Sequence, residues 1–237
     1  TGTWYGTDIR LLKNKSYSDF ETTIAFDIDN QKKAKGITSD DVTTSNNNTD
    51  VRVGDAGFIF RGNTDSGKAS GYILNYLSQW TSGSSNPNKI TLTISSIQDG
   101  SRKTQKNDPF VTIGTINGTT SCVVDLKVQG DTATVTAYKT LADKEAGTVA
   151  ITKTVTLSTA TTKTYNEGYV GFWVNTGDAT KRFVYEAQML KFKSANNYSY
   201  VNAANLVDAN TSIGYGVGSA VLNYDGTTNT VAFKESI

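Results

Sequence analysis

The chain has 237 residues, a length that suits one large all-β sandwich better than two small domains. Lys and Arg total 23 against 22 Asp and Glu, so the formal net charge is +1 and no basic excess of the kind that binds nucleic acid is present. The absence of His excludes a Ser-His-Asp relay, a His-based zinc site and a Cys-His pair. The single cysteine, Cys122, excludes an intrachain disulfide.

Hydropathy and composition narrow the fold class further. No window approaches the run of about 20 apolar residues that spans a bilayer, so no membrane insertion is expected. Thr, Ser and Asn are abundant, whereas Glu, Met and Pro are rare. This composition favours strands and turns over helices.

Alternation with a period of two predicts the strands in chain order. In Asp19–Ile28, Phe20, Ile24 and Phe26 lie on one predicted face and Glu21 on the other, which is typical of a half-buried strand. Asp99-Gly100 and Gly130-Asp131 are turn dipeptides, and each follows another alternating run. The further predicted strands are 56–61, 71–77, 90–95, 122–129, 133–137, 149–157, 169–174, 183–192 and 219–233.

The segments between these strands are polar. Loops are predicted at 34–50, 78–89, 98–109 and 158–168, and Leu141–Ala146 has room for a helix of one or two turns. Residues 62–70 nearly match a phosphate-binding loop, but Ala69 replaces the required Ser or Thr and a strand follows, so a hairpin is predicted. Many short strands separated by turns predict an all-β fold, a two-sheet antiparallel β-sandwich or jelly roll.

Aromatic and polar side chains suggest a saccharide site. Sugar rings pack on aromatic faces while carboxylate, amide and guanidinium groups bond their hydroxyls. Trp173 and Asn175 lie off the predicted core face of their strand, Arg61 ends another strand, and Glu21 lies opposite the apolar face of its own strand. Trp80 falls in the predicted loop at 78–89. Each of these residues also has a purely structural interpretation, as packing, loop anchoring or a solvated ion pair.

Two other kinds of site stay open at this point. The five Glu residues are scattered and form no compact carboxylate motif, although carboxylates from distant strands could converge as in a glycosidase. Asp40, Asp41, Asp50 and Asp55 surround a polar loop, which leaves a structural calcium ion possible although the spacing is not that of an EF-hand.

Three stretches resemble known sugar-binding modules over residues 1–193. Trp4-Tyr5-Gly6-Thr7-Asp8, with Ser18-Asp19-Phe20-Glu21, is similar to carbohydrate-binding modules in tail and baseplate proteins of phages that infect lactic acid bacteria. The stretches 57–61 and 168–173 resemble strands of concanavalin A-like modules, including the fructan-binding modules of exo-levanases. The resemblance implies a concanavalin A-like sandwich with sugar contacts from Asp8, Arg61 and Trp173.

The C-terminal segment suggests how the sandwich closes. Such modules commonly begin with a strand, an Asp-Gly turn and another strand, and a similar stretch here lies at 220–233, with the turn at Asp225-Gly226. We expect one domain over residues 1–237, with 205–237 pairing near the first strand as in a circular permutation. An additional C-terminal hairpin, or the start of a next module, is the alternative.

Together these observations lead to an expected function. We expect a non-catalytic carbohydrate-binding module that needs no cofactor and attaches a phage tail baseplate to cell-surface saccharides of its host. Its partners would be the saccharide and other baseplate proteins, and its location the virion. The alternatives are an accessory module of a secreted fructan hydrolase, in an extracellular location, a structural or protein-binding spacer, and a glycosidase.

Overall fold

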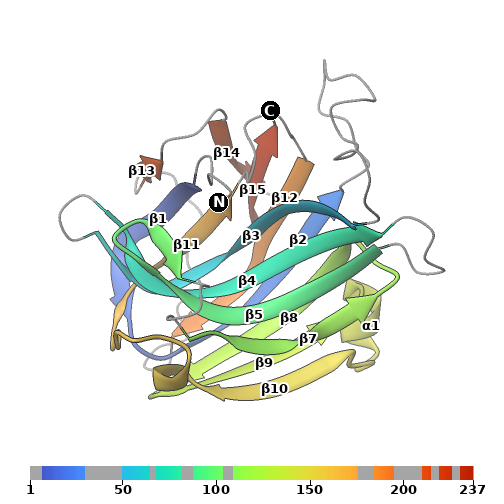
Figure 1. Cartoon of the computed structure of the whole chain (residues 1–237), viewed down its shortest axis with the longest axis horizontal. Helices are drawn as coiled ribbons and strands as arrows, with labels where there is room; N and C mark the ends of the chain where they lie inside the picture. Colours follow the sequence, from blue (N-terminus) through green and yellow to red (C-terminus); the bar gives the residue numbers. More distant parts are fainter. Residues whose placement is uncertain are drawn as a thin grey trace.

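The structure of the chain, a computed structural model, describes residues 7–29, 50–64, 68–81, 88–103, 109–175, 184–194, 210–214, 219–225 and 230–236. Only the backbone is described at 7–8, 14, 28–29, 50–55, 78–81, 101–103, 174–175, 184–186 and from 210 onwards. The described strands form two antiparallel sheets that lie face to face (Figure 1). This arrangement confirms the predicted two-sheet β-sandwich.

The larger sheet has eight strands in the described part of the chain. Their order is β13 (Asn210–Gly214), β1 (Thr7–Tyr17), β11 (Gly168–Asn175), β3 (Asp50–Asn63), β4 (Ser70–Thr81), β5 (Asn88–Gln98) and β6 (Ser101–Lys103), with β7 (Val111–Asn117) also paired with β5. Most of β3, β4 and β11 is buried on both faces where side chains are described.

The smaller sheet has seven described strands. Their order is β10 (Ile151–Thr156), β9 (Thr132–Tyr138), β8 (Ser121–Gln129), β2 (Phe20–Asp29), β12 (Val184–Ser194), β15 (Thr230–Ser236) and β14 (Ser219–Asp225). A short helix, α1 (Leu141–Glu145), links β9 to β10, and a 3-10 turn, η3 (Leu157–Thr159), follows β10. Within the described residues, neither helical segment has the length and apolarity to cross a bilayer.

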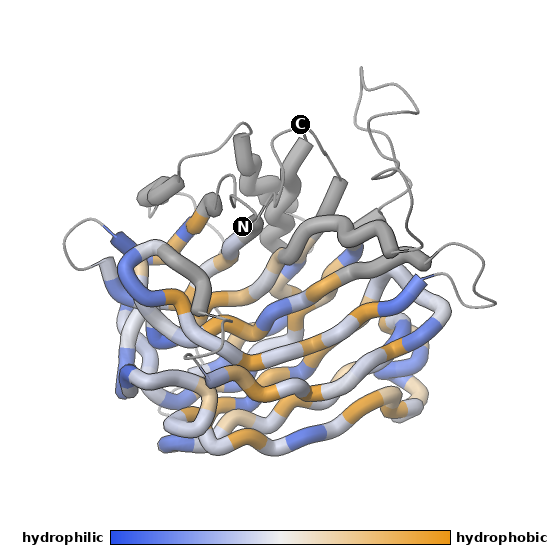
Figure 2. The backbone as a smooth tube through the Cα atoms, viewed as in Figure 1, coloured by the Kyte–Doolittle hydropathy of each residue, from blue (hydrophilic) through white to orange (hydrophobic). Residues whose placement is uncertain are grey.

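Aromatic side chains join the two sheets. Phe20 of β2 meets Phe58 and Phe60 of β3 edge to face, with ring centroids 6.3 and 5.9 Å apart. Phe26 of β2 stacks on Tyr76 of β4 at 5.1 Å. Hydrophobic and hydrophilic positions alternate along many of the strands (Figure 2), as expected for strands that turn one face to a core. The predicted apolar face of β2 is therefore confirmed.

Tight turns confirm the local predictions. Gly130, with a φ of 54°, turns β8 into β9, and Asp99 and Gly100, with φ of 52° and 76°, turn β5 into β6. Asn63 pairs with Ser70 across the β3–β4 connection, so the segment that resembles a phosphate loop is a hairpin. The predicted short helix also forms, with the Thr140 side chain accepting from the Asp143 N–H as its N-cap.

Several elements differ from the sequence-based expectation. Strands β1, β6, β7 and β13 were not among the predicted strands, and β6 lies within the loop predicted at 98–109. Strand β4 extends to Thr81, so Trp80 lies in a strand and its predicted place in a loop is wrong. The predicted strand at 219–233 is two paired strands, β14 and β15. The β13 strand pairs with β1, while β15 pairs with β12. The interpretation of residues 205–237 as a circular permutation stays a prediction.

Candidate functional site

A hollow of about 170 Å³ opens at one end of the smaller sheet, where β2 begins beside the ends of β8 and β12. We call it the Glu21 hollow. Its lining consists of Asp19, Phe20, Glu21, Lys127, Val128, Gln129, Lys193 and Ser194. Six of these eight side chains are polar or charged, so the hollow suits a ligand with many hydrogen-bonding groups.

The strand register explains why two lysines flank Glu21. Lys127 of β8 lies opposite Glu21 of β2, and Lys193 of β12 lies opposite Glu21 on the other side. The ammonium nitrogens are 3.3 and 3.9 Å from the carboxylate oxygens of Glu21. The side chain of Glu21 is 44% exposed and that of Lys127 is 55% exposed. Ion pairs at this exposure contribute about 0 to 1 kcal/mol to stability. The contacts of Glu21 with the two lysines are therefore not what holds the sheet together.

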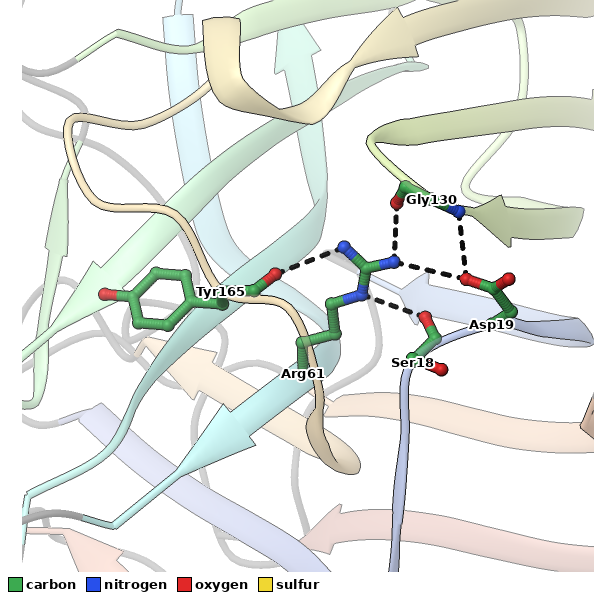
Figure 3. A network of polar contacts seen from close by, with 5 residues as sticks. All are labelled: Ser18, Asp19, Arg61, Gly130 and Tyr165. Atoms are coloured by element: carbon green, nitrogen blue, oxygen red, sulfur yellow. Dashed lines mark hydrogen bonds and ion pairs between the residues drawn. The ribbon is translucent and has the colours of Figure 1, made fainter.

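Asp19 forms another part of the wall, and its position is fixed by hydrogen bonds. Its Oδ1 accepts from the Gly130 N–H at 2.9 Å and lies 3.5 Å from Nη2 of Arg61 (Figure 3). The first bond ties the turn between β1 and β2 to the turn between β8 and β9. The Asp19 carboxylate is thus held at the hollow by two partners and keeps about a third of its surface exposed.

Arg61 is a buried residue that contacts Asp19 and the segments next to the hollow. Its Nε donates to the Ser18 carbonyl at 2.9 Å, Nη1 to the Tyr165 carbonyl at 3.1 Å and Nη2 to the Gly130 carbonyl at 2.6 Å (Figure 3). Burial lowers the pKa of Arg61, and the Asp19 carboxylate opposes that shift. The guanidinium therefore joins three separate segments of the chain at one point.

The predicted sugar contact from Arg61 is corrected by this geometry, because the residue is 3% exposed and its donors are used within the protein. Strict alternation along 56–61 would place Arg61 on the same face as Gly57 and Ile59. The pairing of β3 with β4 shifts register between Phe60 and Asn63, and Arg61 has a left-handed φ of 49°. The alternation of the strand ends there, and Arg61 becomes a positioning residue for Asp19.

Trp173 has no exposed surface, so it offers no ring face to a sugar. It does lie off the main core, as predicted, but it belongs to a second apolar cluster on the outer face of the larger sheet. The other fully buried members are Ile9, Leu11, Ile59, Ala69, Ile73 and Ile97. The expectation that Trp173 stacks on a saccharide is therefore wrong. The larger sheet packs apolar side chains on both of its faces, and Trp173 is buried within the second of these layers.

The remaining predicted residues lie in strands of the larger sheet. Asp8 of β1 pairs with Val174, and Asn175 ends β11 opposite Thr7. Trp80 of β4 lies opposite Val51 and Asn88, in strand rather than loop. The side chains of Asp8, Trp80 and Asn175 lie outside the described part of the chain, so their sugar contacts stay predictions.

The structure therefore divides the predicted site between two sheets. Glu21 lies on the smaller sheet, whereas Asp8, Trp80, Trp173 and Asn175 belong to strands of the larger one. Arg61 links the two, because its guanidinium reaches Asp19 at the Glu21 hollow.

Among the eight lining residues, only Glu21 is a predicted site residue, and the five other polar ones, Asp19, Lys127, Gln129, Lys193 and Ser194, were not predicted. Alternation assigned Lys127 and Gln129 to the outward face of their strand, but nothing local indicated that this strand pairs with that of Glu21.

No group of three or more acidic, Cys or His side chains gathers within the described residues. Of the proposed calcium ligands, Asp40 and Asp41 lie outside those residues, and for Asp50 and Asp55 only the backbone in β3 is described. The calcium expectation therefore stays untested.

Comparison with known proteins gives structural neighbours only. No described protein family matches the chain, and no curated protein sequence matches it. A functionally unknown protein from Saccharomyces cerevisiae matches at 11% identity and a TM-score of 0.33, over 73% of this chain and 67% of that one.

Two structures of the family 7 alginate lyase A1-II′, one in complex with substrate, match at 11% identity and a TM-score of 0.40, over 79% of this chain. They are covered over 64% and 66% of their own length, so the chain spans about two thirds of each of these neighbours.

These neighbours correct one expectation. The chain was expected not to be an enzyme, and two of the solved structures similar to it are enzymes. At this identity and TM-score the matches assign no reaction and no substrate to the chain. The expectation of a non-catalytic protein is therefore withdrawn, and turnover has to be measured alongside binding.

Proposed function

We propose that this chain is a saccharide-binding β-sandwich protein whose ligand occupies the Glu21 hollow. The observation that carries the proposal is the set of groups around one exposed hollow, namely two carboxylates, two ammonium groups, an amide and a hydroxyl. A saccharide hydroxyl both donates and accepts a hydrogen bond, so it can use carboxylates and ammonium groups together. The exposed fractions of Glu21 and Lys127 leave their polar atoms accessible to such a ligand.

The charge of the hollow favours a neutral saccharide. Asp19 and Glu21 contribute two negative charges, and Lys127 and Lys193 contribute two positive ones, so the formal charges of the lining cancel. A strongly anionic ligand would meet two carboxylates, and a cationic one would meet two ammonium groups. A neutral ligand with many hydroxyls avoids both kinds of repulsion.

A row of polar side chains continues from the hollow to the edge of the sheet. In register from β12 to β10 the row contains Lys193, Glu21, Lys127, Thr134 and Thr154. The hydroxyl oxygens of Thr134 and Thr154 are 3.1 Å apart, and those of the neighbouring pair, Thr136 and Thr152, also lie at 3.1 Å.

Five strands at a spacing of roughly 4.8 Å make this row about 19 Å long. That length supports binding of an extended chain of sugar units, with one unit in the hollow and others over the threonines.

The cellular role that we propose is attachment of a phage tail baseplate to a saccharide on the host cell surface. Its support is the similarity of residues 4–8 and 18–21 to phage carbohydrate-binding modules, together with the sandwich fold. A weak site suits this role, because several copies on one baseplate raise the overall affinity by roughly a hundredfold or more.

The test is binding of the purified chain to cell-wall polysaccharides of lactic acid bacteria and to levan, for the wild type and two variants. Glu21→Gln removes the central charge of the row without changing its shape, and should weaken binding by about tenfold, equivalent to about 1.4 kcal/mol. Glu167→Gln changes an exposed glutamate outside the hollow and should bind as the wild type does.

Equal binding by the two variants, or no binding to any saccharide, would contradict the proposal. Release of soluble fragments from a polysaccharide, lost in Glu21→Gln, would show that the same hollow is catalytic.

A further inference from the structure

On the outer face of the larger sheet, one row of paired residues places a tryptophan and a glycine beside polar side chains. In register across β11, β3, β4 and β5 the row contains Trp173, Gly57, Asn75 and Thr93. Ser95 lies two residues beyond Thr93 in β5, so the two side chains share one face of the sheet. This face is opposite to the one that packs against the smaller sheet, since Leu74 and Ile94 belong to the main core.

Asn75 and Ser95 are buried without hydrogen-bond partners. Asn75 is 1% exposed and Ser95 has no exposed surface. Neither Oδ1 nor Nδ2 of Asn75, nor Oγ of Ser95, has a partner among the described residues. Buried polar side chains almost always have a partner, which can be protein, water or a ligand. Three such atoms on neighbouring residues therefore indicate a missing polar occupant.

The neighbouring positions limit what this occupant can be. A Cβ on Gly57 would lie 2.4 Å from Nε1 of Trp173 and 2.4 Å from the Leu74 carbonyl oxygen. The Nε1 edge of the indole thus fills the space over Gly57, the residue that pairs with Asn75. No charged residue stands in the row formed by Trp173, Gly57, Asn75 and Thr93. Within this row, a small uncharged group that both donates and accepts hydrogen bonds matches the atoms of Asn75 and Ser95.

We infer that Asn75 and Ser95 form an enclosed binding site for a neutral hydroxyl-bearing group. An amide supplies two donors and an acceptor with two lone pairs, and the Ser95 hydroxyl supplies one donor and one acceptor. Water and a hydroxyl of a saccharide both satisfy such a set. The site belongs to the other sheet from the Glu21 hollow and does not depend on it.

Substitution with apolar residues of similar shape shows whether the site is occupied. If Asn75 has a bound partner, Asn75→Leu removes its hydrogen bonds, and Tm should fall by at least about 2–4 °C. Ser95→Ala is a smaller change and serves as the second variant in case Asn75→Leu fails to fold. It should also lower Tm. Asn117→Leu, at an exposed position of β7, supplies the control and should leave Tm nearly unchanged.

A rise in Tm for Asn75→Leu and Ser95→Ala would overturn the inference, because an unoccupied polar pair is relieved when it is replaced by apolar groups. The source of the hydroxyl is read from the thermal shift that a neutral cell-wall oligosaccharide produces. A shift lost in Asn75→Leu but kept in Ser95→Thr and Asn117→Leu identifies a saccharide hydroxyl. If Asn75→Leu has a lower Tm without ligand but shows the same oligosaccharide-induced shift as the wild type, the bound group is water. Neither result depends on whether Glu21→Gln affects binding.

Discussion

Arg61, which is 3% exposed, holds the Asp19 carboxylate at the wall of the Glu21 hollow, with Nη2 at 3.5 Å from Oδ1. The same nitrogen donates to the Gly130 carbonyl at 2.6 Å, and the Gly130 N–H donates back to Asp19 at 2.9 Å. These three residues form a closed ring of contacts (Figure 3). The shape of the hollow thus depends on a residue that lies beneath it.

Replacing Arg61 should destabilise the protein more than any single change among the exposed charges of the hollow. Arg61→Lys loses the forked geometry that reaches Ser18, Tyr165 and Gly130 together, and it breaks the buried hydrogen bond to the Tyr165 carbonyl. We expect a loss of roughly 3 kcal/mol in the free energy of unfolding. Denaturant titration measures it, with the exposed Lys163→Met as the control, and equal stability of the two variants would contradict the positioning role.

The threonine row should matter for long ligands only. Thr134→Val with Thr154→Val keeps the shape of the pair and removes both hydroxyls, so it should weaken binding of a polysaccharide but not of a single sugar unit. The matched control is Thr91→Val with Thr115→Val, which removes a pair with the same 3.1 Å contact from the larger sheet. Calorimetry with ligands of increasing length measures the difference. The same loss for both double variants would count against an extended ligand on the smaller sheet.

Tyr165 gives a prediction for alkaline pH. Burial raises the pKa of Tyr165 from 10.0 to about 12, with a hydrogen bond from Ser70 acting in the opposite direction. The unfolded chain loses this proton first, so the contribution to stability is complete below about pH 10 and is lost as pH rises towards 12.

Stability should therefore fall over that window, and the fall should be shallower in Tyr165→Phe. Thermal unfolding from pH 9 to about 12 measures this slope. Tyr169→Phe, for which the ring is less buried, serves as the comparison, and identical slopes in the two variants would argue against the assignment.

Cys122 should be inert in the folded protein. It is 1% exposed within the main core, and burial raises the pKa of its thiol. Because the thiolate is the reactive form, a thiol reagent at neutral pH should modify Cys122 only after unfolding. The rate of modification in native buffer and in denaturant measures this difference, and rapid labelling of the native protein would contradict the burial of β8 against the core.

Local patterns were enough to predict much of the fold. The alternation of Phe20, Ile24 and Phe26 with Glu21 defined the two faces of β2, and Gly130-Asp131 defined the turn between β8 and β9. Strand β1 was missed because Ile9 and Leu11 pack in the second cluster while Leu12 and Tyr17 pack in the main core, and its register with β11 shifts between Leu12 and Tyr17, so no simple alternation remains.

The site was only partly predictable for a related reason. Alternation identified Glu21 as outward-facing, but the register that brings Lys127 and Lys193 beside it joins residues more than a hundred positions apart. Trp173 was assigned to the correct face, yet its burial depends on a second apolar cluster that residues of several strands build together. Long-range pairing, rather than local pattern, decides which side chains remain accessible.

The most direct test of the account is a crystal structure of the chain with the oligosaccharide that it binds. The account predicts a sugar unit in the Glu21 hollow, with hydroxyls within hydrogen-bonding distance of Glu21, Lys127 and Lys193 and further units over Thr134 and Thr154. A sugar bound to the larger sheet, with the Glu21 hollow empty, would contradict it.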